Sequence, residues 1–123
     1  MKGLGIDLCR ISRMEQILHD QPGFLSRYFT AEEQSYLAGR GICAAESAAA
    51  MFAAKEAFLK AIRTGLSGGI RLNEIGIVHQ ENGAPEYHLT GAALETVQQM
   101  GVASLWLSLT HEDDHAAAVC VLE

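Results

Sequence analysis

The residues with the clearest chemical potential lie in one segment, Phe52 to Gly65, which reads FAAKEAFLKAIRTG. The segment holds two of the three lysines of the chain and one carboxylate among apolar and small residues. Glu56 and Lys60 are four residues apart and share one helix face, whereas Lys55 lies about 100° around the axis from Glu56. A solvated ion pair is the common outcome for such spacing. The neighbouring alanines, however, leave room for a ligand, so a site is also expected here.

A second isolated carboxylate, Asp7, follows a short apolar stretch near the start of the sequence. Taken alone, Asp7 fits a residue that ends a strand or caps a turn. Taken with Glu56, it fits a metal ligand, because Mg2+ prefers oxygen and usually binds one or two carboxylates together with substrate phosphates and water. We therefore predict Asp7 and Glu56 as ligands of one Mg2+ ion.

A long helix over residues 44–64 is predicted to position Glu56, because no proline interrupts this stretch and Thr64-Gly65 supplies a stop. Residues 4–9 predict a strand that carries Asp7. Ser12 and Thr30 each precede a glutamate by three residues, and both patterns predict a capping box that opens a helix.

The second half of the sequence predicts a hairpin, a helix and two further strands. The glycine-rich residues 66–69 fit no phosphate-binding fingerprint, and a plain turn is equally expected there. The turn at residues 111–115, His-Glu-Asp-Asp-His, is expected to be a solvated loop rather than a metal cluster, because a hairpin splays its side chains. The predicted elements are strands over 75–79 and 86–90, a helix over 91–100 with Leu94 and Val97 inward, and strands over 103–110 and 116–122.

Composition predicts one globular domain over residues 1–123, since 123 residues with 49% hydrophobic content can bury a core. No apolar run reaches the roughly 20 residues of a membrane span, and the first residues lack the core of a signal peptide, so we expect a cytoplasmic protein without membrane contact. The odd cysteine count and apolar surroundings predict reduced core thiols. These cysteines are Cys9, Cys43 and Cys120.

The net charge of -6 argues against unspecific nucleic-acid binding. Residues 1–40 carry five basic and five acidic groups, whereas residues 41–123 carry four basic and ten acidic groups. An acidic partner is therefore expected to dock on the N-terminal third. Arg10, Arg13 and Arg27 lie there, and each one alone would be read as a solvated surface residue.

The segment F-A-A-K-E-A-F-L-K-A-x-x-T-G resembles the signature of the holo-acyl-carrier-protein synthases, the small 4'-phosphopantetheinyl transferases. Gly5-Ile6-Asp7 matches the other motif of that family, and Ser108-Leu-Thr-His111 before an alanine-rich strand is similar to its ending. The resemblance spans nearly the whole chain. It implies an α+β fold in which a small antiparallel sheet packs against a long central helix.

The resemblance also implies an activity, the transfer of 4'-phosphopantetheine from coenzyme A to a serine of an apo acyl carrier protein with release of 3',5'-ADP. Asp7 and Glu56 would hold Mg2+, and Lys60 would act as a charge stabiliser or proton acceptor. A metal-bound water or a carboxylate is an alternative base. The residues that the resemblance implies for coenzyme A binding are Lys55, Lys60, Gly65, Pro85 and His111. For docking of the carrier protein it implies Arg13, and Arg10 and Arg27 of the same N-terminal third are added as candidates.

Three positions depart from the family pattern. Met51 stands where the family has arginine, Arg63 where it has glycine, and Thr110 where serine precedes the histidine. Met51 matters most, because a guanidinium can form a bidentate contact with phosphate. Arg63 or Arg71 is a candidate to replace it.

Family members form homotrimers with coenzyme A held across each interface, and the same assembly is expected here. Apolar residues of the last two predicted strands offer a surface for the symmetric neighbour. These residues are Leu105, Leu107, Leu109, Val119 and Val121.

Two other functions stay open. One is a non-catalytic module that binds coenzyme A or a carrier protein, and the other is a trimeric scaffold without a small-molecule site.

Overall fold

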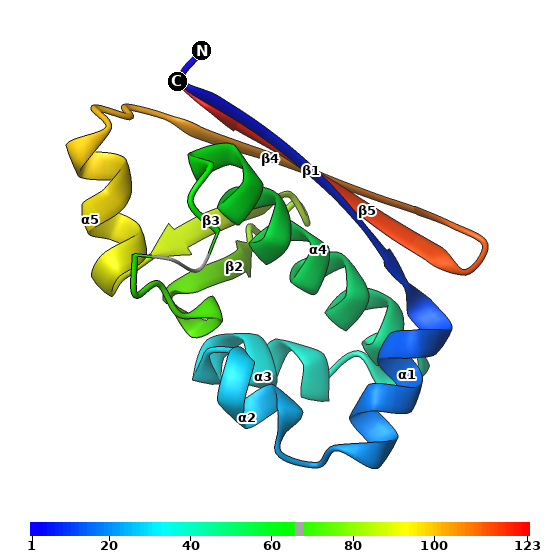
Figure 1. The fold of residues 1–123 in the computed structure, drawn as a ribbon. Helices are drawn as coiled ribbons and strands as arrows, with labels where there is room; N and C mark the ends of the chain where they lie inside the picture. Colours follow the sequence, from blue (N-terminus) through cyan, green and yellow to red (C-terminus); the bar gives the residue numbers. More distant parts are fainter. Residues whose placement is uncertain (66–67) are drawn as a thin grey trace.

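A three-stranded antiparallel sheet and one long helix form the frame of the molecule (Figure 1). The computed structural model describes residues 1–65 and 68–123, so the predicted glycine-rich loop lies partly outside the described residues. The sheet has the order β1-β5-β4, and β2 and β3 form a separate hairpin. This confirms the α+β fold. The strands are β1 (Gly3–Arg10), β2 (Ile75–His79), β3 (Pro85–Leu89), β4 (Leu105–Glu112) and β5 (His115–Leu122).

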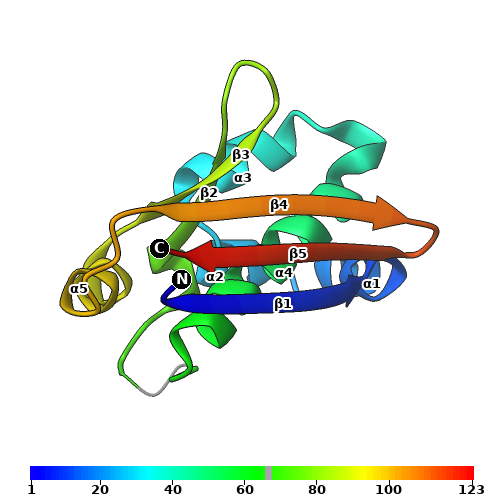
Figure 2. The same ribbon diagram turned by 90° about the horizontal axis from the view of Figure 1, so that it is seen from above.

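The α-helices lie on one side of this sheet (Figure 1). Seen from above, α4 crosses beneath β5 and β1, while α5 lies at the opposite end of the molecule from α1 (Figure 2). The helices are α1 (Ile11–Asp20), α2 (Phe24–Tyr28), α3 (Ala31–Ala38), α4 (Ala44–Ile62) and α5 (Gly91–Gln99), with 3-10 turns η1 (Gly41–Cys43) and η2 (Leu72–Glu74).

Helix α4 is the centre of the core, and its alanines allow β1 to lie directly on it. A Cβ atom on Gly5 would overlap the carbonyl oxygen of Ala57, and one on Gly3 would overlap that of Ala61. This close approach is possible only because glycine has no side chain. The helix ends at Ile62, two residues earlier than predicted, because Arg63 adopts a left-handed conformation with φ of 66°.

Only one of the two predicted capping boxes forms. The hydroxyl of Thr30 accepts from the Glu33 amide at 3.0 Å, and the Glu33 carboxylate accepts from the Thr30 amide at 2.8 Å. The box at Ser12 is wrong, because β1 runs straight into α1 and Ser12 already lies in the first turn. Asp114, from the β4–β5 turn, caps this helix instead and accepts from the amide and hydroxyl of Ser12 at 2.9 and 2.5 Å.

Several smaller expectations also change. Residues 24–28, read as an aromatic segment, form the short helix α2. Leu94 was expected inward on α5 but is 39% exposed, since Ala93 and Val97 provide the buried face. The three cysteines are free, yet only Cys120 is buried. Cys43 is exposed because it lies in the η1 turn just before α4, outside the core, and Cys9 is half-buried near the end of β1.

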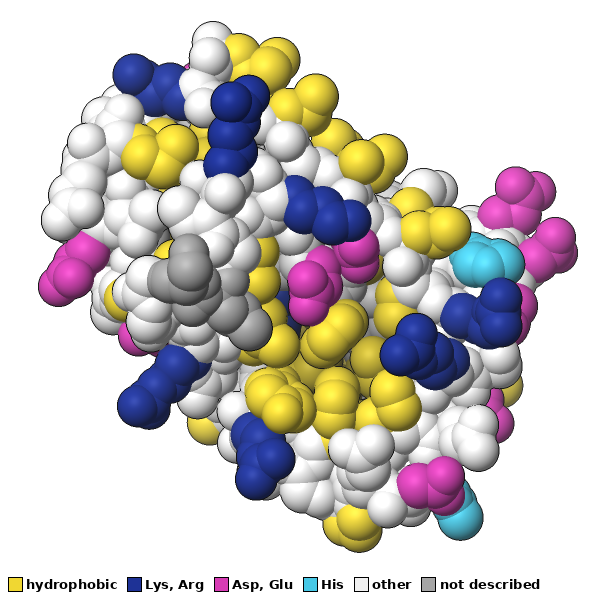
Figure 3. Space-filling model, in the orientation of Figure 1, with side chains coloured by type: hydrophobic (Ala, Val, Ile, Leu, Met, Phe, Trp, Pro, Cys, Tyr) yellow, Lys and Arg dark blue, Asp and Glu magenta, His cyan; other side chains and the backbone are white. Residues whose placement is uncertain are grey.

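The outer face of the sheet is apolar, but with a different membership from the one predicted. Leu105, Leu107 and Leu109 turn toward the core, because alternate residues of a strand point to opposite faces. The exposed face combines Val119 and Val121 of β5 with neighbours on both flanking strands. Figure 3 shows hydrophobic side chains along the edge of the molecule at which this outer face lies. Its most exposed members are Leu4, Ile6, Leu8 and Trp106, which are 58–66% exposed.

The described helices include none that is both long and apolar enough to cross a membrane.

Candidate active site

Strand β1 and helix α4 bring Asp7 and Lys60 into contact. The Lys60 ammonium donates to Asp7 Oδ1 at 2.8 Å and to the Ile6 carbonyl at 3.1 Å. The Asp7 side chain is 18% exposed and that of Lys60 is 56% exposed. The hydrogen bond to Asp7 and its charge raise the pKa of Lys60. Lys60 is therefore an ammonium at neutral pH, suited to stabilise negative charge.

Glu56 lies one helical turn before Lys60 and faces the same region. Burial raises the pKa of the Glu56 carboxyl, the negative charge of Asp7 raises it further, and Lys60 partly opposes both effects. Two neighbouring carboxylates that repel each other create a demand for positive charge. Lys60 meets part of that demand, and a cation would meet the rest.

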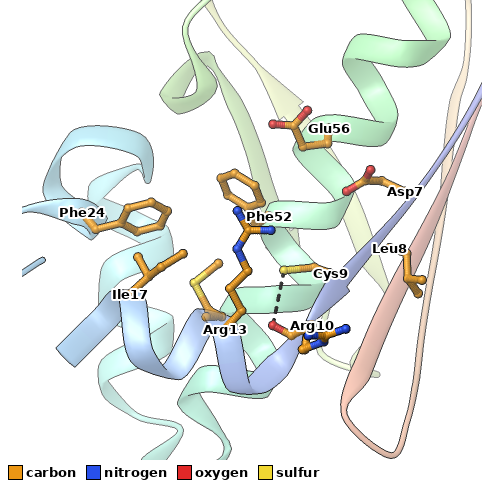
Figure 4. Close-up of a pocket in the computed structure, with 10 residues that line it drawn as sticks. Asp7, Leu8, Cys9, Arg10, Arg13, Ile17, Phe24, Phe52 and Glu56 are labelled. Atoms are coloured by element: carbon orange, nitrogen blue, oxygen red, sulfur yellow. Dashed lines mark hydrogen bonds between the residues drawn. The ribbon is translucent and has the colours of Figure 1, made fainter. Parts of the chain in front are cut away.

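A groove of about 400 Å³ opens beside the two carboxylates (Figure 4). Asp7 and Glu56 form one end, aromatic and aliphatic side chains form the wall, and Arg13 extends across it from α1. In the space-filling view, acidic and basic side chains meet above this hydrophobic hollow (Figure 3). The lining residues are Asp7, Leu8, Cys9, Arg10, Arg13, Met14, Ile17, Phe24, Phe52 and Glu56.

A second, more basic hollow adjoins Glu56 on its other side. It encloses about 500 Å³ and is lined by Lys60, Arg63 and Gly65 together with Leu59. Glu56 therefore stands between an apolar groove with arginines at its rim and a hollow whose charges are mainly positive. An anionic phosphate fits the second hollow better than the first.

Lys55 does not join these residues. It is fully buried, and its three ammonium protons are used by Glu33 at 2.7 Å and by the carbonyls of Leu72 and Ile75 at 3.1 and 2.8 Å. Burial lowers the pKa of Lys55, against the opposing effect of Glu33. The sequence analysis predicted that Lys55 contacts a phosphate, and the structure shows that this prediction is wrong. Lys55 directly precedes Glu56 on α4, but its side chain points into the core and not into either groove.

His111 and Pro85 lie away from Asp7. The Nε2 atom of His111, near the end of β4, is 3.4 Å from Glu46 Oε1 at the start of α4. Strands β1 and β4 are the two edges of the sheet, with β5 between them. His111 therefore lies across the sheet from Asp7, while Pro85 opens β3 of the separate hairpin. Neither residue lines the grooves at Glu56.

The predicted docking arginines spread over two surfaces. Arg10 and Arg13 line the groove of Asp7, whereas Arg27 borders a neighbouring hollow at α2 and lies 5.9 Å from the Tyr28 ring. The aromatic wall of the groove was not predicted. Phe52 could have been found, because it precedes Glu56 by four residues and so shares its helix face. Phe24 carried no such periodic signal.

The donor set at Asp7 fits a hard cation. The described residues contain no group of three or more His, Cys, Asp or Glu side chains arranged to hold a metal. The paired carboxylates with a raised pKa on Glu56 nonetheless suit a Mg2+ ion that takes its remaining ligands from substrate phosphate and water.

Comparison with known proteins gives consistent similarities. Residues 3–120 match the 4'-phosphopantetheinyl transferase superfamily. The chain is 46% identical to the holo-[acyl-carrier-protein] synthase of Treponema denticola over 98% of this chain and 97% of that protein, and 44% identical to that of Trichlorobacter lovleyi over 98% and 96%.

Solved structures show the same likeness. The holo-[acyl-carrier-protein] synthase of Neisseria meningitidis superposes with a TM-score of 0.90 at 31% identity and covers 100% of this chain and 98% of that one. The Helicobacter pylori synthase in complex with coenzyme A gives a TM-score of 0.82 at 28% identity, with coverage of 98% and 99%.

Proposed function

Because the chain belongs to the 4'-phosphopantetheinyl transferase superfamily and to its holo-acyl-carrier-protein synthases, we propose that it transfers 4'-phosphopantetheine from coenzyme A to a serine of an apo acyl carrier protein. The observation that carries this proposal is the convergence of Asp7, Glu56 and Lys60 from two distant segments. A module that only binds coenzyme A has no need of this cluster. The reaction would belong to fatty acid biosynthesis in the cytoplasm.

In the transfer, the serine oxygen attacks a phosphorus of the coenzyme A pyrophosphate, the bond from that phosphorus to the bridging oxygen breaks, and 3',5'-ADP leaves as the serine loses its proton. Asp7 and Glu56 would hold Mg2+, which when bound neutralises charge on the pyrophosphate oxygens. Lys60 stabilises the charge of the transferring phosphate, because its raised pKa keeps it protonated. A protonated Lys60 cannot accept the serine proton, which would pass to a carboxylate of the site or to water.

The carrier protein would approach from the side of α1. Arg13 reaches across the groove from this helix, and Arg10 lines the same groove. Arg27 adds positive charge at the neighbouring hollow. An acidic carrier surface is attracted to this face, and the apolar wall can receive one of its hydrophobic side chains.

We further propose a homotrimer with the active site shared between subunits. His111 is on the opposite sheet edge from Asp7, so a coenzyme A that contacts both would have to bridge two chains. The exposed apolar face of the sheet supports such an assembly, because a symmetric neighbour would bury it. Pro85 and Gly65 are assigned to coenzyme A by resemblance.

The test is to incubate the purified chain with coenzyme A, Mg2+ and an apo acyl carrier protein, and to measure the intact mass of the carrier. We expect the mass to increase by one phosphopantetheine group. A carrier whose acceptor serine is replaced by alanine and the Glu56→Gln enzyme serve as controls and should show no increase. An unchanged wild-type carrier across several carriers would overturn the proposal and favour the binding module.

A further inference from the structure

The basic hollow beside Glu56 holds a cation that the family pattern does not have. Arg63 lines this hollow together with Lys60, at a position where the family has glycine. Met51, which replaces the family arginine, is completely buried in α4 and presents no charge to a ligand. Of the two candidates to replace that arginine, Arg71 lines neither of the two hollows at Glu56, whereas Arg63 lines one. Arg63 is therefore the cation that this chain adds to the site.

The backbone of Arg63 has a conformation that suits glycine better than arginine. Its φ of 66° and ψ of 5° lie in the left-handed region, where a Cβ atom crowds the following carbonyl oxygen. Asp113 is the only other described residue besides glycine with a positive φ, and aspartate tolerates this region better than arginine. Strain of this kind is concentrated at functional sites. A glycine would end α4 here without strain, so the guanidinium is expected to offset the cost.

Arg63 supplies the positive charge in the hollow that is not already paired. The Lys60 ammonium lies 2.8 Å from Asp7 Oδ1, and Glu56 is the one carboxylate among the described lining residues. Arg63 itself makes no salt bridge to any residue that the structure describes. With both carboxylates ionised, the three other groups carry one excess negative charge, and the guanidinium neutralises it. An anion can therefore enter the hollow without the repulsion that a glycine at this position would leave.

The place of Arg63 along α4 indicates which phosphate it meets. The apolar groove lies beside Phe52, toward the start of the helix, the basic hollow lies toward its end, and Glu56 lines both (Figure 4). A serine that attacks from the groove leaves the departing oxygen on the far side of the phosphorus, because the two oxygens lie roughly in line. That far side is the basic hollow. Arg63 lies beyond Lys60 there, so it is placed for the departing phosphate.

We infer that Arg63 binds the phosphate that departs with 3',5'-ADP, a contact that a glycine at this position cannot make. This inference rests on the proposed function. When the bond from the transferred phosphorus to the bridging oxygen breaks, its electron pair stays on that oxygen, so negative charge grows on the departing phosphate. A guanidinium can donate two parallel hydrogen bonds to phosphate oxygens and stabilise this charge as it develops. Arg63 neither donates nor accepts a proton in the step.

Arg63→Gly is the decisive variant, because relief of strain and loss of charge predict opposite effects. Removal of the strained side chain should leave the melting temperature equal or higher. Loss of the guanidinium should lower kcat/KM for coenzyme A by about tenfold or more. Circular dichroism measures the first effect, and carrier mass measurements at varied coenzyme A measure the second. A kcat/KM within a factor of about two of the wild type would overturn the inference.

Two further variants separate the charge from the flexibility of glycine. Arg63→Asn tolerates the left-handed conformation but lacks the charge, so it should lose as much kcat/KM as Arg63→Gly. Arg63→Lys keeps the charge but not the fork, so it should lose less. Arg71→Ala removes an exposed arginine outside both hollows and is the matched control, with kcat/KM unchanged. A fully active Arg63→Asn enzyme would trace the loss in Arg63→Gly to chain flexibility and overturn the role of the guanidinium.

Calorimetric titration identifies the phosphate that Arg63 contacts. Arg63→Gly should weaken binding of 3',5'-ADP and of 5'-AMP by the same factor and leave binding of adenosine 3'-phosphate unchanged, because the departing phosphate is the 5'-phosphate. Weaker binding of adenosine 3'-phosphate instead, or unchanged binding of all three in an active enzyme, would overturn the inference and leave the proposed function intact. A wild-type chain that transfers nothing from coenzyme A would remove the proposed function and the inference together.

Discussion

Glu56 carries a charge that its surroundings disfavour, and this gives it a pH-dependent effect on stability. Its pKa is raised above the ordinary value of 4.5 by burial and by Asp7. The folded state therefore holds the proton more tightly than the unfolded state, and stability falls as the pH rises from that ordinary value through the folded pKa. Without a cation the ionised Glu56 destabilises the folded state, and a cation bound beside it would offset this cost.

The first prediction concerns removal of this charge. Glu56→Gln should unfold at a higher temperature than the wild type at about pH 8 without Mg2+, and at nearly the same temperature at about pH 3, where Glu56 is protonated in the folded and in the unfolded state. Its turnover should fall by at least about 100-fold, because a metal ligand is lost. Thermal unfolding by circular dichroism and carrier mass measurements test the two parts.

Asp7→Asn is the companion variant and should lose a similar share of turnover. If either variant kept more than about a third of wild-type turnover at saturating Mg2+, the ligand assignment would be wrong.

The second prediction concerns Lys55, which sits beside Glu56 in sequence but belongs to the core. Lys55→Met should cost about 3–5 kcal/mol of unfolding free energy, because it leaves Glu33 charged and buried without its partner. Urea denaturation measures this. The Glu33→Gln, Lys55→Met double variant should recover part of the loss. A Lys55→Met enzyme of normal stability with a raised KM for coenzyme A would return Lys55 to the phosphate site.

Some of the site residues could be predicted from the sequence, and others could not. Glu56 and Lys60 were predictable as neighbours because helical spacing places them on one face, whereas Asp7 was joined to them by the chemistry of paired carboxylates and by the family motif. The role of Lys55 was not predictable, since helical geometry fixes the angle between neighbouring residues but not which side of the helix meets the core. Its partner Glu33 was recognised only as a capping residue, and nothing local indicates that the same carboxylate also binds a lysine.

At the scale of elements, the contact of β1 with α4 is what places Asp7. The third prediction is that Gly5→Ala prevents this contact, because a Cβ atom would overlap the Ala57 carbonyl. Overpacking of this kind costs about 1–3 kcal/mol or more, and displacement of Asp7 should lower activity as well. Gly23→Ala is the matched control, because nothing lies within 4 Å of its Cβ position. Equal melting temperatures for the two variants would contradict the prediction.

The fourth prediction concerns helix α1 as the carrier-docking element. Arg13→Glu should raise the KM for carrier protein far more than that for coenzyme A, and wild-type activity should fall with salt as charge attraction is screened. Steady-state kinetics with each substrate varied in turn measure both effects. The Arg71→Ala enzyme should behave like the wild type. Equal effects on both substrates would remove α1 as the docking face.

Element boundaries were predicted where the signal is local and missed where it is tertiary. The Thr30 box forms because its two partners are three residues apart. The start of α1 depends on Asp114, which is 102 residues from Ser12, so no local pattern could reveal it. The inward face of α5 was misjudged at Leu94 because a short helix with two alanines and few large apolar residues has no single dominant apolar stripe.

At the scale of the whole molecule, the exposed apolar sheet face predicts the assembly. The fifth prediction is that Val119→Glu, in the centre of this face, gives a monomer with little activity, because a buried charge at a subunit interface is costly. Light scattering measures the mass, and Trp106, the single tryptophan, should report the loss of burial as a red-shifted emission. Leu94→Glu, on another exposed apolar position, should remain trimeric.

Mixed trimers extend the same prediction to the shared site. Asp7→Asn and His111→Ala enzymes, each inactive, should regain part of the wild-type activity when dissociated and reassociated together, because some interfaces then pair two intact halves. Mixtures that never exceed either parent, or a monomeric wild type, would contradict the shared site and leave the single-chain cluster of Asp7, Glu56 and Lys60 standing.

The pairing of β1 with β5 has a consequence for how the protein is made. Residues 3–10 find their strand partner in residues 115–122, so the sheet joins segments that leave the ribosome at very different times. Such long-range pairing is slow to form, and its apolar strands stay unprotected until the partner is available. A nascent chain therefore carries its signature helix long before Asp7 has a fixed place beside it. Activity should arise only when synthesis has passed β5.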